Sequence, residues 1–156
     1  MTSCLCGIQL NYSQCCEPFI DGKLNPTTPE TLMRSRYVAY ALGKEHYLIQ
    51  SWHPSTRPSA IDLSSKNQEK WLRLDIKNTV FTLGVKEGWV HFIAYFKFQE
   101  QLYALEETSR FLLENNLWYY VDGQHHTRPI KKGRNELCIC LSGKKYKRCC
   151  GSFNKK

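Results

Sequence analysis

The chain has 156 residues, of which 42% are hydrophobic and 13% aromatic, and its formal net charge is +8. This length suits one compact domain with small appendages and excludes two full domains. No apolar run approaches the roughly 18 residues of a transmembrane helix, so we predict no membrane span. The charge is uneven, because residues 127–156 carry ten Lys or Arg and one acid. The basic character therefore belongs to the tail.

Four cysteines stand close together at the start of the chain, with the spacing CxCx8CC. They are Cys4, Cys6, Cys15 and Cys16. Four thiolates gathered by one short loop form the tetrahedral set that Zn(II) takes in structural sites, and iron fits the same sulfurs. Disulfides are the alternative. They are disfavoured because adjacent cysteines pair poorly and because no signal peptide is visible, which predicts a reducing, cytoplasmic compartment.

Residues 17–30 have the composition of a linker, and a helix is predicted to start at its end. Thr28 is the candidate N-cap, and Gly43 ends the helix. Apolar residues recur along it at helical spacing. This stripe consists of Leu32, Met33, Tyr37, Val38 and Leu42. Arg34 and Arg36 are expected to point away from most of the stripe, with a position in a groove as the alternative.

Two further helices are predicted before the sheet, over residues 44–52 and 65–74. Pro54 and Pro58 prevent the first of them from continuing. From residue 76 the apolar period changes to two, which predicts four strands with turns between them. Their ranges are 76–86, 89–99, 102–113 and 117–122. Helices followed by a curved antiparallel sheet describe an α+β cone.

The cone is expected to hold a pocket with acidic, basic and aromatic groups. The candidates are His53, Arg57, Tyr95, Glu107, Arg110 and Tyr120. His53 follows a helix, where an imidazole can act as a general base. The alternative, which we favour, is that His53 and Arg57 fix an irregular loop by hydrogen bonds. No nucleophile and base spacing is recognisable, so the pattern leans against an enzyme.

Strand alternation constrains the other polar residues. Glu106 and Glu107 are adjacent in a strand, so they face opposite sides and cannot act as one pair. Glu107 is expected to form an ion pair with Arg110 at the rim. His125 and His126 fall just past the last predicted strand and are interpreted as a solvated turn, with a stray metal contact as the alternative.

The cysteine spacing of the N-terminus occurs again at Cys138, Cys140, Cys149 and Cys150, so all eight cysteines are used. Aligning the two copies superposes Tyr12 on Tyr146. The second copy also carries four cations within five residues. These are Lys144, Lys145, Lys147 and Arg148. Such a cluster on a folded loop favours an anionic partner (an acidic protein surface, a ribosome or RNA) over a merely solvated tail.

The second copy resembles the SEC-C motif, best known from the C-terminal tail of the SecA preprotein translocase motor. The pattern of that family is close to GRND followed by CPCGSGKKYKKCC, and residues 133–150 read GRNELCICLSGKKYKRCC. Ile139 replaces the usual Pro and Leu141 the usual Gly, while every ligand stays in place. In the translocase motor this knuckle docks on a chaperone and the ribosome, which implies a docking role here.

The middle of the chain resembles the nuclear transport factor 2-like, or cystatin-like, cone, and more narrowly the YchJ-like family of bacterial SEC-C proteins. The resemblance is carried by MRSRY (33–37), WHPSTRP (52–58), ETSRF (107–111) and WYYVDG (118–123). This family is functionally uncharacterised. Cones of this fold often pair through the open sheet face, so the resemblance implies a homodimer.

We therefore expect an N-terminal knuckle (1–22), a cone (23–127) and a basic C-terminal knuckle (128–156). The favoured function is a metal-stabilised binding or adaptor protein that docks through the C-terminal knuckle; the alternative is a small enzyme or ligand binder that uses the cone. A deep cavity lined by His53 and an acid favours the alternative, and a cone filled by its own aromatics favours the adaptor. Metal removal is expected to disorder both knuckles and leave the cone folded.

Overall fold

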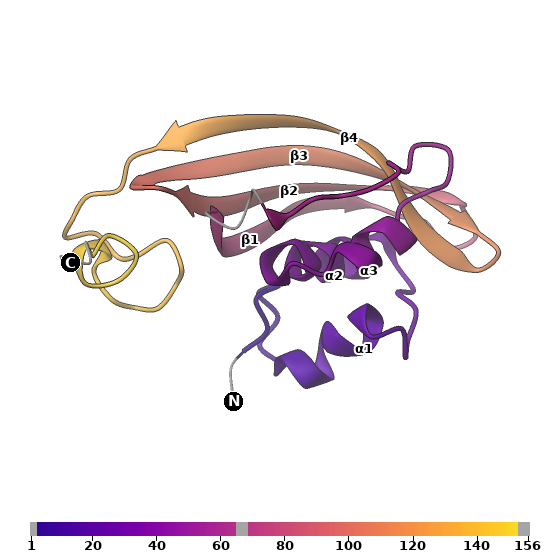
Figure 1. Cartoon of the computed structure of the whole chain (residues 1–156), viewed down its shortest axis with the longest axis horizontal. Helices are drawn as coiled ribbons and strands as arrows, with labels where there is room; N and C mark the ends of the chain where they lie inside the picture. Colours follow the sequence, from indigo (N-terminus) through magenta and orange to yellow (C-terminus); the bar gives the residue numbers. More distant parts are fainter. Residues whose placement is uncertain (1–2, 65–68, 153–156) are drawn as a thin grey trace.

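The computed structural model describes residues 3–64 and 69–152 and is an α+β cone with a cysteine cluster at each end (Figure 1). Its helices are η1 (Tyr12–Gln14), α1 (Glu17–Ile20), α2 (Pro29–Leu42), α3 (Glu45–Gln50) and a last turn, η3 (Tyr146–Arg148). Its strands are β1 (Glu69–Val80), β2 (Glu87–Phe98), β3 (Gln101–Glu114) and β4 (Leu117–Ile130). They form one antiparallel sheet in the order β1-β2-β3-β4, so the predicted meander is confirmed.

The α2 helix has the boundaries predicted for it. Thr28 Oγ1 accepts a hydrogen bond of 3.1 Å from a backbone N–H of the first turn, and Gly43 ends the helix with a φ of 69°. The α3 helix lies inside its predicted range. The predicted linker, in contrast, contains α1, where the N–H of Ile20 donates to the carbonyl of Cys16. Among the helices of the described residues, none has the length and apolarity needed to cross a membrane.

The helix predicted over residues 65–74 is wrong where the chain is described, because β1 already begins at Glu69; residues 65–68 lie outside the described residues. The register of β1 against β2 shifts after Trp71 and again after Ile76. Each shift interrupts the alternation of apolar and polar residues. The two-residue period that marks a strand is therefore hidden in this stretch of sequence.

The last strand is longer than predicted. β4 continues to Ile130, so His125 and His126 lie in a strand and not in the expected turn. The pairing of β3 with β4 has a register shift at Val121, which leaves one extra residue in β4. The extra residue swaps the two faces of β4 beyond Val121. The alternation of apolar and polar residues that marks a half-buried strand therefore does not continue through the bulge.

Both α2 and α3 cover one face of the sheet, and the core lies between them (Figure 1). Val38, Val90 and Phe111 are fully buried there. The N-terminal cysteine cluster belongs to the same core, whereas the C-terminal cluster lies beyond one end of the sheet (Figure 1). The two knuckles thus differ in how closely they are joined to the cone.

Candidate functional site

The four N-terminal cysteine sulfurs lie within 4.8 Å of one another. Those of Cys6 and Cys15 are 3.5 Å apart, those of Cys15 and Cys16 are 3.9 Å apart, and all eight cysteines are free of disulfides. A zinc ion about 2.3 Å from four sulfurs at the corners of a tetrahedron holds those sulfurs about 3.8 Å apart. The cluster therefore fits one tetrahedral ion.

Hydrogen bonds within this cluster shift the thiol pKa values in opposite directions. The bond between the Cys4 and Cys16 side chains lowers the pKa of Cys4 and raises that of Cys16. A metal ion must displace the protons that remain, because it binds the thiolate form of each cysteine. Metal affinity at this cluster is therefore expected to fall as the pH falls.

The C-terminal cluster has the same geometry. Its four sulfurs also lie within 4.8 Å of one another, and the Cys140 sulfur is 3.5 Å from those of both Cys138 and Cys149. Ser142 Oγ is 3.2 Å from the Cys149 sulfur, so a polar group of the chain already lies against this ligand. Each end of the chain can thus hold a metal ion with four cysteines.

The backbone around the two clusters repeats as well as the cysteines. In each copy the N–H of the first cysteine donates to the carbonyl six residues later. The N–H of the residue after the second cysteine donates back to the carbonyl of the first cysteine. The N–H of the third cysteine donates to the carbonyl of the tyrosine. The bonds are Cys4 to Leu10 (2.7 Å), Gly7 to Cys4 (3.3 Å) and Cys15 to Tyr12 (3.1 Å), matched by Cys138 to Lys144 (2.8 Å), Leu141 to Cys138 (3.2 Å) and Cys149 to Tyr146 (3.0 Å). The two ends are structural copies of one loop.

The two copies differ in backbone strain at one position, the residue after the second cysteine. Gly7 has a φ of 90°, and Leu141 occupies the equivalent position with a φ of 62°. A left-handed conformation costs a non-glycine residue about 1–2 kcal/mol. The loss of the glycine that the SEC-C pattern carries at this point therefore adds strain to the C-terminal loop.

The clusters also differ in their surroundings. Cys4, Cys6 and Cys16 are 4%, 0% and 2% exposed and pack in the cone core, whereas only Cys138 is fully buried at the other end. The N-terminal loop is tied to α2 because Arg34 Nη1 donates to the Cys6 carbonyl at 2.6 Å. This packing revises the expectation that metal removal leaves the cone intact, because part of the cone's own core is built on the N-terminal cluster.

Lys97 ties the C-terminal knuckle to the sheet. Lys97 Nζ, on β2, donates to the Cys150 carbonyl at 2.6 Å, and the Lys97 side chain is 14% exposed. Tyr146 packs against the backbone of Gly151, and burial raises the pKa of its hydroxyl. Its ring is therefore partly used inside the knuckle and is not a free platform for stacking.

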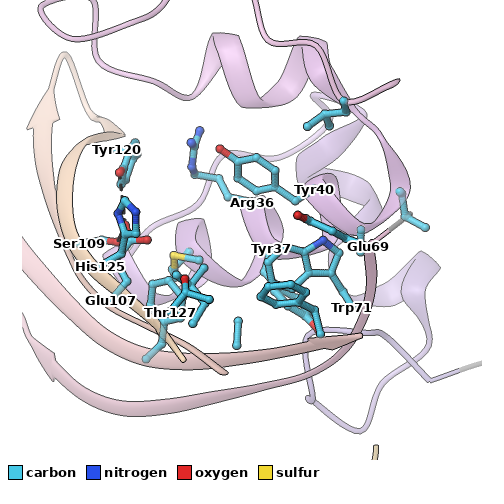
Figure 2. A pocket seen from close by; sticks show the side chains of 18 of the residues that line it. Arg36, Tyr37, Tyr40, Glu69, Trp71, Glu107, Ser109, Tyr120, His125 and Thr127 are labelled. Carbon is cyan, nitrogen blue, oxygen red and sulfur yellow. Dashed lines mark hydrogen bonds between the residues drawn. The ribbon is translucent and has the colours of Figure 1, made fainter. Parts of the chain in front are cut away.

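A cavity of about 530 Å³ opens between α2 and the inner face of the sheet (Figure 2). This volume lies within the range of small-molecule sites. The labelled side chains lie around the hollow, with Trp71 and Tyr37 on the side opposite Glu107 and Tyr120 (Figure 2). The polar residues that line it are Arg36, Tyr40, Glu69, Glu107, Ser109, Tyr120, His125 and Thr127.

The Glu107 carboxylate is held in place by two hydroxyl groups. Its Oε1 accepts hydrogen bonds from Ser109 Oγ (2.8 Å) and from the Tyr120 hydroxyl (3.3 Å). Burial raises the pKa of Tyr120, so its hydroxyl remains a proton donor. Gly123 on β4 leaves the space that the carboxylate occupies, because a Cβ there would lie 2.9 Å from the carboxylate carbon. The acid is thus positioned by its neighbours.

Only two of the six sequence candidates line this cavity, Glu107 and Tyr120. His53 and Arg57 fix the loop after α3: His53 Nδ1 is 2.6 Å from Ser55 Oγ, and Arg57 Nε donates to a main-chain carbonyl at 2.9 Å. His53 Nε2 lies 2.9 Å from a carboxylate oxygen of Glu114 without the alignment of a hydrogen bond. These two residues therefore have the loop-fixing contacts that we favoured.

The remaining two candidates, Tyr95 and Arg110, do not line the cavity. Arg73 lies 5.6 Å from the centre of the Tyr95 ring. Arg110 pairs with Asp122 (3.1 Å) and with Glu87 (3.4 Å), so the expected pair with Glu107 is wrong. These contacts follow from the alternation, which places Arg110 and Glu107 on opposite faces of β3.

Glu106 confirms the same alternation. It pairs with His91 (2.8 Å) and Arg128 (3.2 Å), while its neighbour Glu107 lines the cavity. The predicted separation of the two acids is therefore confirmed. A homodimer through the outer sheet face remains a prediction.

Six of the polar cavity residues are missing from the sequence candidates: Arg36, Tyr40, Glu69, Ser109, His125 and Thr127. Ser109 follows Glu107 by two residues, so strand alternation alone places it on the same face. His125 is directly opposite Glu107 in the β3–β4 register, but the bulge hides this position. Arg36, expected to point away from most of the apolar stripe, is instead 2% exposed. Its burial depends on rings from distant parts of the chain.

Residues 28–123 match the family described as "YchJ, middle NTF2-like domain", and residues 134–152 match the SEC-C motif. A UPF0225 protein of Vibrio cholerae is 44% identical over 151 residues, which cover 96% of this chain and 99% of that protein. This chain belongs to the YchJ-like UPF0225 family. A UPF0225 protein of Serratia proteamaculans is 46% identical over 154 residues, covering 95% of this chain and 97% of the relative.

Solved structures also resemble this UPF0225 protein. The solution structure of a SEC-C motif protein from Rhodopseudomonas palustris has a TM-score of 0.71 and 29% identity, and it covers 79% of this chain and 98% of its own. The crystal structure of a SEC-C motif protein from Psychrobacter arcticus has a TM-score of 0.69 and 30% identity, with 97% and 96% covered. The predicted family and the predicted cone are confirmed.

Proposed function

We propose that this UPF0225 protein is a zinc-stabilised binding protein whose basic C-terminal knuckle docks on an anionic macromolecule. The observation that carries the proposal is the arrangement of Lys144, Lys145, Lys147 and Arg148 on a loop held by four cysteines. In residues 3–64 and 69–152, none of these cations forms an ion pair, and only Lys147 is partly buried. Exposed, clustered and unpaired cations attract phosphates or carboxylates. A cytoplasmic location accords with eight free thiols.

The metal is tested by elemental analysis of the purified chain. We expect two zinc ions per chain, because each cluster supplies four thiolates at tetrahedral spacing. Cys149→Ser is expected to reduce the content to one zinc, since it removes a ligand from the C-terminal cluster only. Two irons per chain would replace zinc in the proposal. A loss of both ions from Cys149→Ser would show that the clusters are coupled.

The docking is tested with purified ribosomes, because RNA phosphate is the densest anionic surface available to this loop. Replacement of the four cations by alanine is expected to weaken binding at low salt. It is also expected to reduce the slope of log K against log salt by about 3, at roughly 0.7–0.9 for each phosphate that the variant no longer neutralises. The matched control replaces four exposed lysines of the cone. They are Lys44, Lys70, Lys77 and Lys86.

The control variant has the same net charge as the test variant, so a specific knuckle site predicts normal binding for it. An equal loss of ribosome binding in the two variants would show that binding depends on the net charge of the protein and not on the knuckle. If wild-type protein binds no ribosome but is retained by an acidic protein surface, the partner is a protein and not RNA. Because the Tyr146 ring is packed within the knuckle, binding is expected to depend on charge more than on stacking.

A second candidate function is small-molecule binding in the cone. The observation that favours it is the cavity of about 530 Å³, which the aromatic side chains of the cone leave open. The acids that line it are Glu69 and Glu107, while His53 lies in the loop outside, so a catalytic role for His53 in this cavity has no support. Ala94→Leu fills the cavity from β2 and is expected to abolish any small-molecule binding while the fold is retained.

A further inference from the structure

Aromatic rings gather on one side of the cavity, together with the carboxylate of Glu69 (Figure 2). Trp71, Tyr37 and Tyr40 lie on one side of the hollow, while Glu107, Ser109 and Tyr120 lie on the other (Figure 2). Arg36 extends from α2 between Tyr120 and Tyr40 (Figure 2). A molecule that fills this space meets aromatic rings beside Glu69 on one side and fixed hydrogen-bonding groups on the other.

The Arg36 guanidinium has more donors than acceptors around it. Its Nη1 donates to the carbonyl of Leu48 at 2.8 Å and to Ser51 Oγ at 2.7 Å, and the Tyr40 hydroxyl interacts with it as well. A guanidinium has five N–H donors, so these neighbours leave some of them without an acceptor. In the part of the chain that the structure describes, no carboxylate lies within the 4.0 Å of an ion pair with Arg36.

Aromatic rings stabilise this cation only partly. The guanidinium carbon lies 4.6 Å from the centre of the Tyr120 ring, 5.1 Å from that of Trp52 and 6.0 Å from that of Tyr40. Burial lowers the pKa of Arg36, yet a guanidinium stays charged near neutral pH. A buried charge normally has a counter-ion. Glu107 attracts this cation electrostatically from beyond ion-pair distance, so the cavity has a fixed positive group with no anion in direct contact among the described residues.

Glu107 limits which anion fits. Its Oε1 is occupied by Ser109 and Tyr120, while its second oxygen has no donor among the described residues. A doubly charged phosphate would be repelled by this carboxylate more strongly than a singly charged carboxylate would be. The free oxygen instead favours a ligand that brings an O–H or N–H donor of its own.

We propose that the cone binds a small, flat monocarboxylate that also has a hydrogen-bond donor. The ligand carboxylate binds Arg36, its donor meets Glu107, and its ring packs against Trp71. This inference rests on the second candidate function, small-molecule binding in the cone. It adds the chemical class of the ligand and the residues that select it.

The probe is 4-hydroxycinnamate, compared with its neutral amide and with cinnamate, which lacks the hydroxyl. Binding is measured by titration calorimetry and by ligand-observed NMR on the full-length zinc-loaded protein. We expect the acid to bind at least tenfold more tightly than the amide, because only the acid pairs with the guanidinium. We also expect cinnamate to bind several-fold more weakly than its hydroxylated form, since it offers Glu107 no donor.

Two variants locate the effect. Arg36→Gln is expected to remove the preference for acid over amide, whereas Arg34→Gln, two residues away on the same helix and bonded to the Cys6 carbonyl, keeps it. Ala94→Leu is expected to abolish binding of all three probes. If Arg36→Gln fails to fold, as shown by its thermal melt, the wild-type comparison of acid with amide still decides the proposal.

The outcomes separate the two proposals. Equal binding of acid and amide that disappears in Ala94→Leu supports a ligand-binding cone and overturns the carboxylate class. If folded, zinc-loaded wild-type protein binds none of the probes, the carboxylate proposal is overturned. The broader proposal of small-molecule binding is overturned only if native mass spectrometry also finds no bound compound. Tight acid binding that survives Arg36→Gln also overturns the role assigned to Arg36.

Discussion

Cys6→Ser is expected to destabilise the whole cone, not only the N-terminal knuckle. Cys6 is fully buried, and its cluster packs in the same core as α2 and the sheet. Loss of the ion removes the ordering of this loop and leaves a hydroxyl in an apolar core. We expect a loss of about 4 kcal/mol or more in the free energy of unfolding, which lowers the Tm by roughly 10 to 15 °C.

The matched control is Cys140→Ser, because Cys140 occupies the equivalent position in the second copy. It also removes one ion, but from a cluster that touches the cone through Lys97. All four tryptophans lie between residues 52 and 118, so tryptophan fluorescence reports on the cone alone. We expect the melt followed this way to shift by no more than about 3 °C in Cys140→Ser. Similar shifts in the two variants would contradict the asymmetry.

This asymmetry separates two uses of one loop. The N-terminal copy gives its cysteines to the core and carries no equivalent of Lys144 or Lys145, so an ion bound there would act as an internal cross-link. The C-terminal copy keeps the cations exposed and is fastened mainly by Lys97. A single cysteine spacing thus supports a folding role at one end and presents a charged surface at the other.

The cysteine clusters could be predicted from the sequence because their geometry is local. Eight residues between the two cysteine pairs leave the chain few ways to bring the sulfurs together, and the same hydrogen bonds close both loops. The α2 helix was predictable for the same reason, since its cap and its terminal glycine act within one turn. Signals of this kind need no knowledge of the rest of the fold.

The cavity could not be predicted in the same way because it depends on register. A bulge at Val121 decides that His125 faces the hollow, and two shifts in β1 decide where Trp71 lies. Arg36 is a further case, since a buried cation is tolerated only where Tyr120 and Trp52 surround it. The secondary-structure propensities of the residues do not specify these strand registers or side-chain contacts.

Gly123→Ala is expected to dislodge the Glu107 carboxylate. The new Cβ would lie 2.9 Å from the carboxylate carbon and 3.1 Å from Cγ, so Glu107 must leave its position. Ser109, which is fully buried, then loses the acceptor of its hydroxyl. Because Glu107 borders the open cavity, its side chain can move aside, so the expected loss is that of an unsatisfied buried hydroxyl, about 1–3 kcal/mol.

A double-mutant cycle distinguishes this mechanism from a general intolerance of β4. Glu107→Ala alone costs the hydrogen bonds of Ser109 and Tyr120, but it also empties the space that the new methyl group requires. Gly123→Ala should therefore cost little in the Glu107→Ala background, with a coupling energy of about 1–3 kcal/mol measured by denaturant unfolding. Additive losses would mean that the glycine serves the backbone of β4 instead of the acid. A coupling of the expected size would establish that β3 and β4 are matched in sequence to hold one carboxylate in the cavity.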